Sequence, residues 1–190
     1  MKKSAMLILV CLLAVFTAAC GNGKNRLHIP VEPFQFTDQN GRPFALSDLN
    51  GKVWIADVVF THCMTVCPAM TANMAKLQGK LKETGVEAEL VSFSIDPDKD
   101  DPEALRTYLG KFDADFANWH ALTGYTFDEI KSFLLKSFKS YISRDTATDQ
   151  IIHSTSFFLV DRSGTVVAKY DGALDTPYER IIKDIKALDR

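Results

Sequence analysis

Two cysteines separated by three residues are the part of this sequence best suited to chemistry. Cys63 and Cys67 follow an apolar run that ends at Phe60, and Pro68 comes directly after the second cysteine. If the backbone turns helical over this segment, a spacing of four places both sulfurs on one face. Two thiols that close can form a disulfide or bind a soft metal ion, and most functional hypotheses depend on which they do.

The first residues have the pattern of an export signal. Two lysines precede an apolar stretch over residues 5–16, and small residues then lead to Cys20. This pattern predicts a cleaved signal peptide over residues 1–19, and its apolar core is short for a membrane span. A cysteine directly after the small residues resembles a bacterial lipoprotein signal, which predicts lipidation of Cys20. An uncleaved signal anchor is the main alternative, because Thr17 stands where such signals usually carry Leu.

Export changes the interpretation of the cysteines. We expect residues 20–30 to form a flexible tether and residues 31–190 a folded domain, held by the lipid on the extracytoplasmic side of the cell membrane. The thiols left in that domain are Cys63 and Cys67, in an oxidising compartment. A purely structural Cys63–Cys67 disulfide would close a small loop, which stabilises little and is easily reduced. The pair is therefore more typical of a redox-active or metal-binding site.

Length and composition limit the possibilities. The chain has 190 residues, of which 46% are hydrophobic and 24% charged, and a formal net charge of -2. These values are typical of one globular domain with a short extension. The small negative net charge gives no reason to expect nucleic acid as a partner.

Hydrophobic periodicity predicts strands that alternate with helices. A hairpin is expected around Gln39-Asn40-Gly41, and a second hairpin near the C-terminus. The other expected strands are residues 53–60, 90–95 and 119–122, and the expected helices begin near residues 68, 101, 127 and 178. This order predicts an α/β domain with a central mixed β-sheet flanked by helices and an N-terminal β-hairpin extension. Two cysteines after the first buried strand make it thioredoxin-like, at a helix N-terminus whose dipole favours thiolate.

Several segments together resemble the Sco family, whose members assist assembly of the copper centre of cytochrome c oxidase. They are Phe60 to Pro68 with the following Met70-Thr71-Ala72-Asn73-Met74, residues 92–97, residues 122–124, and His153 to Asp161. The resemblance covers the chain from about Phe34 to the C-terminus. A histidine about ninety residues after the cysteine motif and directly before a strand makes the match specific.

The resemblance implies that Cys63, Cys67 and His153 bind a copper ion, as Cu(I) or Cu(II). Two soft thiolates suit Cu(I), and an imidazole lets the same site hold Cu(II). Zinc accepts these donors but usually has a fourth protein ligand in a structural site. Many Sco sequences have Pro and Asp after the first cysteine, where this chain has Met64 and Thr65. That difference leaves the donor atoms unchanged but can alter the stiffness of the loop, the redox potential of the thiols or the recognition of a partner.

Other histidines and methionines have simpler interpretations. His62 adjoins Cys63 on an extended loop, so we interpret it as a neighbour that lowers the thiol pKa and not as a ligand. His28 and His120 are interpreted as surface or structural residues. Met70 and Met74 fit the core stripe of a helix, which leaves Met64 open as a further copper contact.

Two acids are candidates for supporting roles. Asp57 falls inside a buried strand, where a carboxylate is costly unless its hydrogen bonds are satisfied. Thioredoxins place an acid on the equivalent strand, which suggests a proton-handling role in thiol chemistry. Asp96 precedes Pro97 at the end of the next strand, where it can orient a ligand, contact a partner or simply form a turn.

The functional prediction is a membrane-anchored copper-binding assembly factor, a metallochaperone more than an enzyme. It would deliver copper to the copper-bearing subunit of cytochrome c oxidase, change the redox state of thiols there, or both, with a thiol reductant as a further partner. The alternative is a thiol-disulfide oxidoreductase that acts on client cysteines without copper, in which His153 is dispensable. A peroxiredoxin is disfavoured, because Phe60 stands where such enzymes need Thr or Ser before the reactive Cys63.

Overall fold

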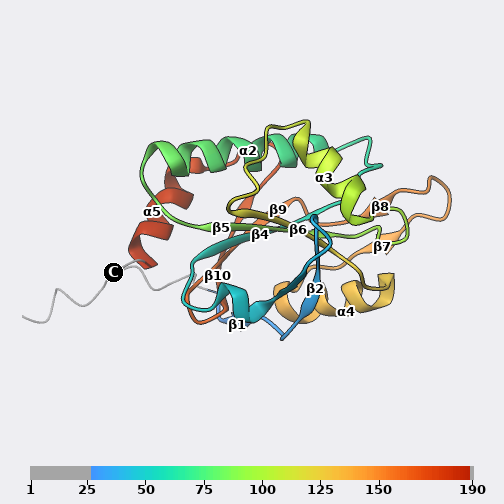
Figure 1. Ribbon diagram of the computed structural model, residues 1–190, viewed down its shortest axis with the longest axis horizontal. Coiled ribbons are helices and arrows are strands. Elements are labelled where there is room, and N and C mark those ends of the chain that lie inside the picture. Colours follow the sequence, from blue (N-terminus) through green and yellow to red (C-terminus); the bar gives the residue numbers. More distant parts are fainter. Residues whose placement is uncertain (1–26, 189–190) are drawn as a thin grey trace, which may run out of the picture.

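A mixed eight-stranded sheet forms the centre of the structure, and helices cover both of its faces (Figure 1). The computed structural model describes residues 27–188. The strands of this sheet are β1 (Ile29–Pro30), β2 (Gln35–Asp38), β3 (Pro43–Ala45), β4 (Trp54–Val59), β5 (Glu89–Ser94), β6 (Trp119–Thr123), β9 (Ser156–Val160) and β10 (Thr165–Asp171). A separate small hairpin pairs β7 (Ser143–Arg144) with β8 (Ile151–Ile152). The helices are η2 (Leu46–Leu49, a 3₁₀ turn), α2 (Cys67–Glu83), α3 (Pro102–Gly110), α4 (Phe127–Phe138) and α5 (Tyr178–Leu188).

The three buried strands β4, β5 and β6 run parallel, and the sheet continues antiparallel on both sides in the order β1-β10-β9-β4-β5-β6-β2-β3. Every residue of β4 is buried, as expected for a strand covered on both faces. β9 pairs antiparallel with β4, with Ile55 opposite Leu159. The beginning of β9 therefore lies beside the end of β4.

Two hydrophobic clusters fill the two sides of the sheet. On one side, α2, α3 and α5 pack their apolar residues against it, among them Met74, Leu105 and Ile185, each fully buried. On the other side, α4 packs Ile130 and other residues together with the aromatic side chains that precede and follow β2. Figure 1 shows α2 and α3 above the sheet and α4 below it. The predicted α/β, thioredoxin-like architecture is confirmed.

The structure adds strands that the sequence pattern did not predict. β1 pairs with β10 inside the segment predicted as a tether, so the sheet already includes Ile29 and Pro30. The β7–β8 hairpin was not predicted either, because strands of two residues are too short to show a period. The expected N-terminal hairpin is present as β2 and β3, and Asp38 accepts hydrogen bonds from the backbone of its turn.

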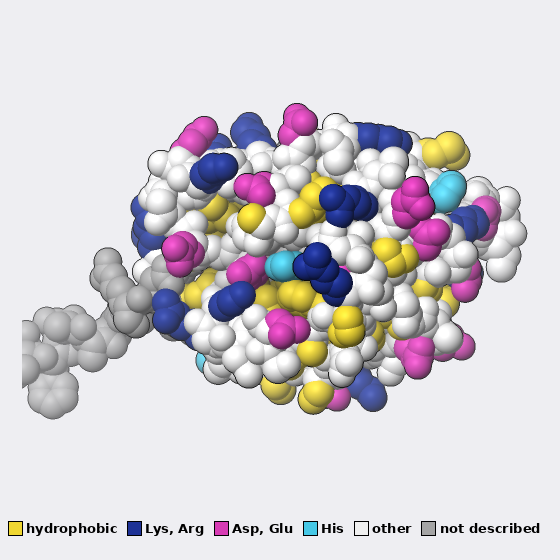
Figure 2. Space-filling view, viewed as in Figure 1, with side chains coloured by type: hydrophobic (Ala, Val, Ile, Leu, Met, Phe, Trp, Pro, Cys, Tyr) yellow, Lys and Arg dark blue, Asp and Glu magenta, His cyan; other side chains and the backbone are white. Residues whose placement is uncertain are grey.

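The predictions for the signal peptide and for lipidation of Cys20 concern positions outside the described residues. Within residues 27–188, no helix has the length and apolar character needed to cross a membrane. Figure 2 shows acidic and basic side chains intermixed over one face of the molecule, so that face has no broad region of a single charge among the described residues.

Two glycines differ in what a side chain would meet, which gives a test of the fold. Gly79 lies in α2 with open space around an added Cβ, so Gly79→Ala is expected to raise the free energy of unfolding by about 0.5–1 kcal/mol. Gly124 has a φ of +87°, and an added Cβ would lie 2.7 Å from Thr37 Oγ1. Gly124→Ala is therefore expected to destabilise the protein by about 1–3 kcal/mol. Urea unfolding of both variants checks this, and equal effects would contradict the described backbone.

Candidate metal centre

The two cysteines lie where β4 ends and α2 begins. Cys67 is the first residue of α2, and Cys63 lies in the loop before it. Val66, the N-cap residue, makes no side-chain cap hydrogen bond. The backbone N–H of Cys67 instead donates to Cys63 Sγ at 3.3 Å, so this sulfur satisfies one of the free N–H groups of the helix start. The sulfurs therefore meet because the loop folds over the helix end, and the condition for a shared helical face is not met, since Cys63 precedes the helix.

His153 reaches the same place from the far end of the sequence. It lies between β8 and β9, and the antiparallel pairing of β9 with β4 brings it beside the cysteines. Its Nε2 atom is 3.4 Å from Cys67 Sγ. The ligand atoms of Cys63, Cys67 and His153 all lie within 4.8 Å of one another. The structure thus brings together the three residues that the resemblance implied as ligands.

The imidazole of His153 is held in one orientation. Its Nδ1 atom lies 2.9 Å from the carbonyl oxygen of Ser154. A carbonyl oxygen only accepts hydrogen bonds, so Nδ1 is the donor of this contact, and in the neutral ring Nε2 then carries a lone pair on the side of Cys67. Phe60 packs edge-on against the ring, with centroids 5.9 Å apart. A histidine fixed through its other nitrogen is the usual arrangement for a metal ligand.

The environment makes the two thiols unequal. A hydrogen bond from Cys67 lowers the pKa of Cys63 from 9.0 to about 4, and the backbone and hydroxyl of Thr65 lower it further against the opposing effect of burial. The same hydrogen bond, together with burial, raises the pKa of Cys67. Cys63 is therefore the thiolate at neutral pH and Cys67 the proton donor. Both cysteines are free in the structure, so a Cys63–Cys67 disulfide stays a prediction for an oxidised form.

The donor set suits a soft or borderline metal ion. Two sulfurs and one imidazole match the preferences of copper, and three protein donors leave room for a further ligand from outside. Cys63 is 7% exposed, and His153 is half-buried. The site is therefore covered yet close to the surface, as exchange of a bound ion requires.

The neighbouring candidates do not join this cluster. His62 is exposed, and its ring lies 3.0 Å from Thr61 Oγ1. Met64 is 81% exposed, so its thioether faces solvent in this conformation. His120 stacks on Phe44 and lies 3.1 Å from a carboxylate oxygen of Glu89, in agreement with a structural role.

The helix methionines and the exposed histidine behave as the sequence suggested. Met70 and Met74 are buried in the core under α2, and His28 is exposed. The thioethers of α2 therefore belong to packing between helix and sheet.

Asp57 is buried in the middle of β4. Its carboxylate accepts a hydrogen bond from Ser92 Oγ at 2.6 Å, and Ser92 in turn accepts one from the indole of Trp119 at 2.9 Å. Burial raises the pKa of Asp57 from 3.8 to about 7, and the bond from Ser92 opposes this rise only in part. A negative charge on Asp57 also raises the pKa of Cys67. The carboxyl is therefore near enough to influence the thiol electrostatically.

The acids that follow β5 hold the loops around the site. Asp96 is 1% exposed, and it forms an ion pair with Arg144 at 3.2 Å, in addition to shaping the turn. Asp100 accepts hydrogen bonds from the backbone and the hydroxyl of Thr61, directly after β4. Sequence reasoning singled out Asp96 but neither Asp100 nor Arg144, because only the folded chain brings them to the site.

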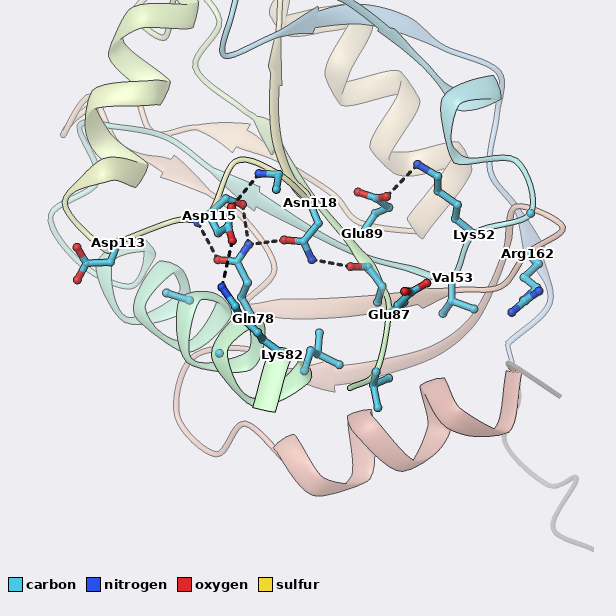
Figure 3. Close-up of a pocket in the computed structure, with 17 residues that line it drawn as sticks. Lys52, Val53, Gln78, Lys82, Glu87, Glu89, Asp113, Asp115, Asn118 and Arg162 are labelled. Atoms are coloured by element: carbon cyan, nitrogen blue, oxygen red, sulfur yellow. Dashed lines mark hydrogen bonds and ion pairs between the residues drawn. The ribbon is translucent and has the colours of Figure 1, made fainter. Parts of the chain in front are cut away.

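A separate cavity of about 600 Å³ lies where β4 and β5 begin, away from the cysteines, with Val53 and Glu89 in its lining. Figure 3 shows the residues that line it. Its charged residues are largely paired, with Lys52 on Glu89 and Lys82 on Asp115. Among the described residues, its lining contains neither a thiol nor an imidazole. The cavity is therefore unsuited to a soft metal and lies apart from the cysteine site.

The comparison with protein families decides the classification. The SCO1/SenC family model matches residues 23–189. The chain belongs to the SCO1/SenC family. It is 44% identical over 178 residues to a SCO1 protein homolog of Bacillus subtilis. The aligned region covers 93% of this chain and 92% of that relative.

Solved structures of family members have the same fold. A SCO1/SenC family lipoprotein from Bacillus anthracis is 49% identical, with a TM-score of 0.85 over 88% of this chain and 99% of that one. BsSco, described as a member of the Sco family of cytochrome c oxidase assembly proteins with a disulfide switch, is 44% identical with a TM-score of 0.81, over 87% of this chain and 96% of that one. Yeast Sco1 with copper bound is 28% identical with a TM-score of 0.69, over 84% of this chain and 90% of that one.

The unequal thiols lead to a first prediction for the site. Cys67→Ala removes the hydrogen-bond donor and is expected to raise the pKa of Cys63 from about 4 toward its ordinary value. Cys67→Ser keeps a donor and is expected to raise it less. The pH dependence of Cys63 alkylation, followed by mass spectrometry, measures both. An unchanged profile in the alanine variant would show that Cys67 does not stabilise the thiolate.

Asp57 leads to a second prediction. Folding raises its pKa from 3.8 to about 7, so between these pH values the folded protein holds a proton that the unfolded chain has lost. Stability therefore falls as the pH rises through this window. Asp57→Asn is expected to remove this part of the pH dependence of the unfolding free energy, measured with urea, whereas exposed Asp113→Asn should not. Equal slopes in the wild type and Asp57→Asn would contradict the raised pKa.

Proposed function

We propose that this chain binds copper through Cys63, Cys67 and His153 and assists assembly of the binuclear copper centre of cytochrome c oxidase. The observation that carries the proposal is the approach of two sulfurs and one oriented imidazole nitrogen to within 4.8 Å of one another. Yeast Sco1 is known with copper bound, and BsSco is described as an oxidase assembly protein. Membership of their family supports the same role here.

Delivery by ligand exchange suits the surroundings of the site. Three exposed apolar side chains flank it and form what we call the apolar rim: Met64, Ile152 and Leu174, exposed by 81%, 64% and 93%. Leu174 is included because it lies two residues after Gly172, whose N–H donates to the carbonyl of Thr155, itself two residues after His153. Apolar side chains around a metal site favour docking of another protein. The proposed partner is the copper-bearing subunit of the oxidase.

We further propose that the protein is anchored by a lipid on Cys20 and faces the extracytoplasmic side of the cell membrane. The support is the signal-like pattern of residues 1–19 and the cysteine directly after it. The similar structure from Bacillus anthracis is described as that of a lipoprotein. An anchor of this kind would keep the copper site close to a membrane-bound oxidase.

Thiol redox chemistry is a second candidate, favoured by the lowered pKa of Cys63. Its thiolate would attack a client disulfide, form a mixed disulfide and release one client thiolate. Cys67, after losing its proton, would attack Cys63 and release the second client thiolate. The client gains two electrons, and the Cys63–Cys67 disulfide must then be reset by a thiol reductant.

Copper titration of the reduced protein tests the first candidate. Wild type is expected to bind one copper ion, and both Cys63→Ser and His153→Ala are expected to weaken binding by at least ~10-fold because each removes a donor. His28→Ala is the matched control, because it removes an exposed histidine that lies near the start of β10, whereas the copper site lies near the end of that strand. Affinity is measured by competition with a copper chelator.

The same variants separate the two candidates. If His153→Ala binds copper as tightly as His28→Ala does, the proposed three-ligand site is refuted. If wild type binds no copper but Cys63 exchanges with a client disulfide, the oxidoreductase function replaces the copper function.

A further inference from the structure

The loop between β5 and α3 contacts both of the segments that carry the donor atoms. Asp100 holds the cysteine segment, since its carboxylate accepts bonds from Thr61 N at 3.2 Å and from Thr61 Oγ1 at 2.6 Å. Ser94 Oγ donates to the other carboxylate oxygen of Asp100 at 2.6 Å. Thr61 lies two residues before Cys63. The chain entering the cysteine motif is therefore attached to the end of β5.

The same loop holds the segment that carries His153 through ion pairs. Arg144 of β7 contacts Asp96 Oδ1 at 3.2 Å and Asp98 Oδ2 at 2.6 Å. Lys99 contacts Asp149 at 2.5 Å, at the turn between β7 and β8. The strand β7 and the turn after it are thus fixed to residues 96–99, although 48 residues separate Asp96 from Arg144.

Outside these ion pairs, burial of Ile151 in the core helps to hold the hairpin, but no described strand of the main sheet pairs with it. Its strands have two residues each and pair only with one another, outside the main sheet. A two-stranded hairpin alone is marginally stable in water. β8 ends at Ile152, directly before His153, so a displacement of the hairpin would shift the imidazole relative to the sulfurs.

We propose that residues 96–99 and their ion pairs with Arg144 and Asp149 position His153 for copper binding. Asp96 is a strong anchor, because its carboxylate is buried and such a charge needs a cationic partner. Arg144 suits this role, since its planar guanidinium reaches two carboxylates at once. These are positioning residues, which act on the metal only through the placement of His153. The inference rests on the proposed copper function.

Arg144→Gln tests the inference, with copper affinity of the full reduced protein as the measurement. The variant is expected to bind copper about 10-fold more weakly, the effect typical of residues that orient a metal ligand. Arg144→Lys keeps a positive charge and is expected to recover part of the loss. Exposed Asp149→Asn breaks the ion pair with Lys99 without changing buried Asp96 and is expected to weaken binding as well.

Lys80→Gln is the matched control. Lys80 is as exposed as Arg144, pairs with Glu179 and lies over the ring of Tyr178, much as Arg144 lies over Phe127. It is near the end of α2 remote from the cysteines. Lys80→Gln is expected to leave copper affinity unchanged. That result would show that removing a paired cation does not by itself weaken copper binding.

Two further measurements test whether the effect of Arg144→Gln acts through His153. The absorption of the Cu(II) complex should change in Arg144→Gln toward that of His153→Ala, and the rate of thiol exchange at Cys63 should stay that of wild type. If both Arg144→Gln and Asp149→Asn bind copper as Lys80→Gln does, the inference is overturned while the copper function stands. If wild type itself binds no copper, the proposed function fails first.

Discussion

The antiparallel pairing of β9 with β4 is the constraint on which the site depends. β4 is one of three parallel strands, so its carboxyl end lies at the same edge of the sheet as the end of β5. Because β9 runs the other way, its beginning lies at that edge too. A histidine before β9 therefore meets cysteines after β4, whatever the length of chain between them. Neither segment alone could form the site.

Many of the strands, helix starts and candidate ligands could be predicted from the sequence, because they depend on local sequence patterns. Dense apolar runs identified β4 and β5, and Asp101 and Thr126 cap α3 and α4 as residues of their types do. The cysteine spacing and the late histidine identified the donors through a resemblance. Their actual approach follows from strand order, which the pattern of one strand does not determine.

The structural features that the sequence did not predict depend on contacts between residues that are distant in the chain. The partner of Asp96 is Arg144, and nothing in either local sequence indicates that pairing. β7 and β8 are too short to show a period, and β1 is recognisable as a strand only through its pairing with β10. Likewise, nothing in the local sequence indicates that the Cys63 sulfur accepts a hydrogen bond from the backbone at the start of α2. Such arrangements are products of tertiary packing.

The orientation of His153 has a consequence for how the site takes up any cation. With Nδ1 engaged by Ser154, the lone pair of Nε2 points at the one thiol that keeps its hydrogen. The neighbouring Cys63 and burial raise the pKa of Cys67, so one of the three donor atoms holds a proton more strongly than an ordinary thiol does. A metal can reach all three only by expelling that proton, so acidity in the surroundings competes directly with the ion. A proton and a metal ion therefore compete for the same three donor atoms.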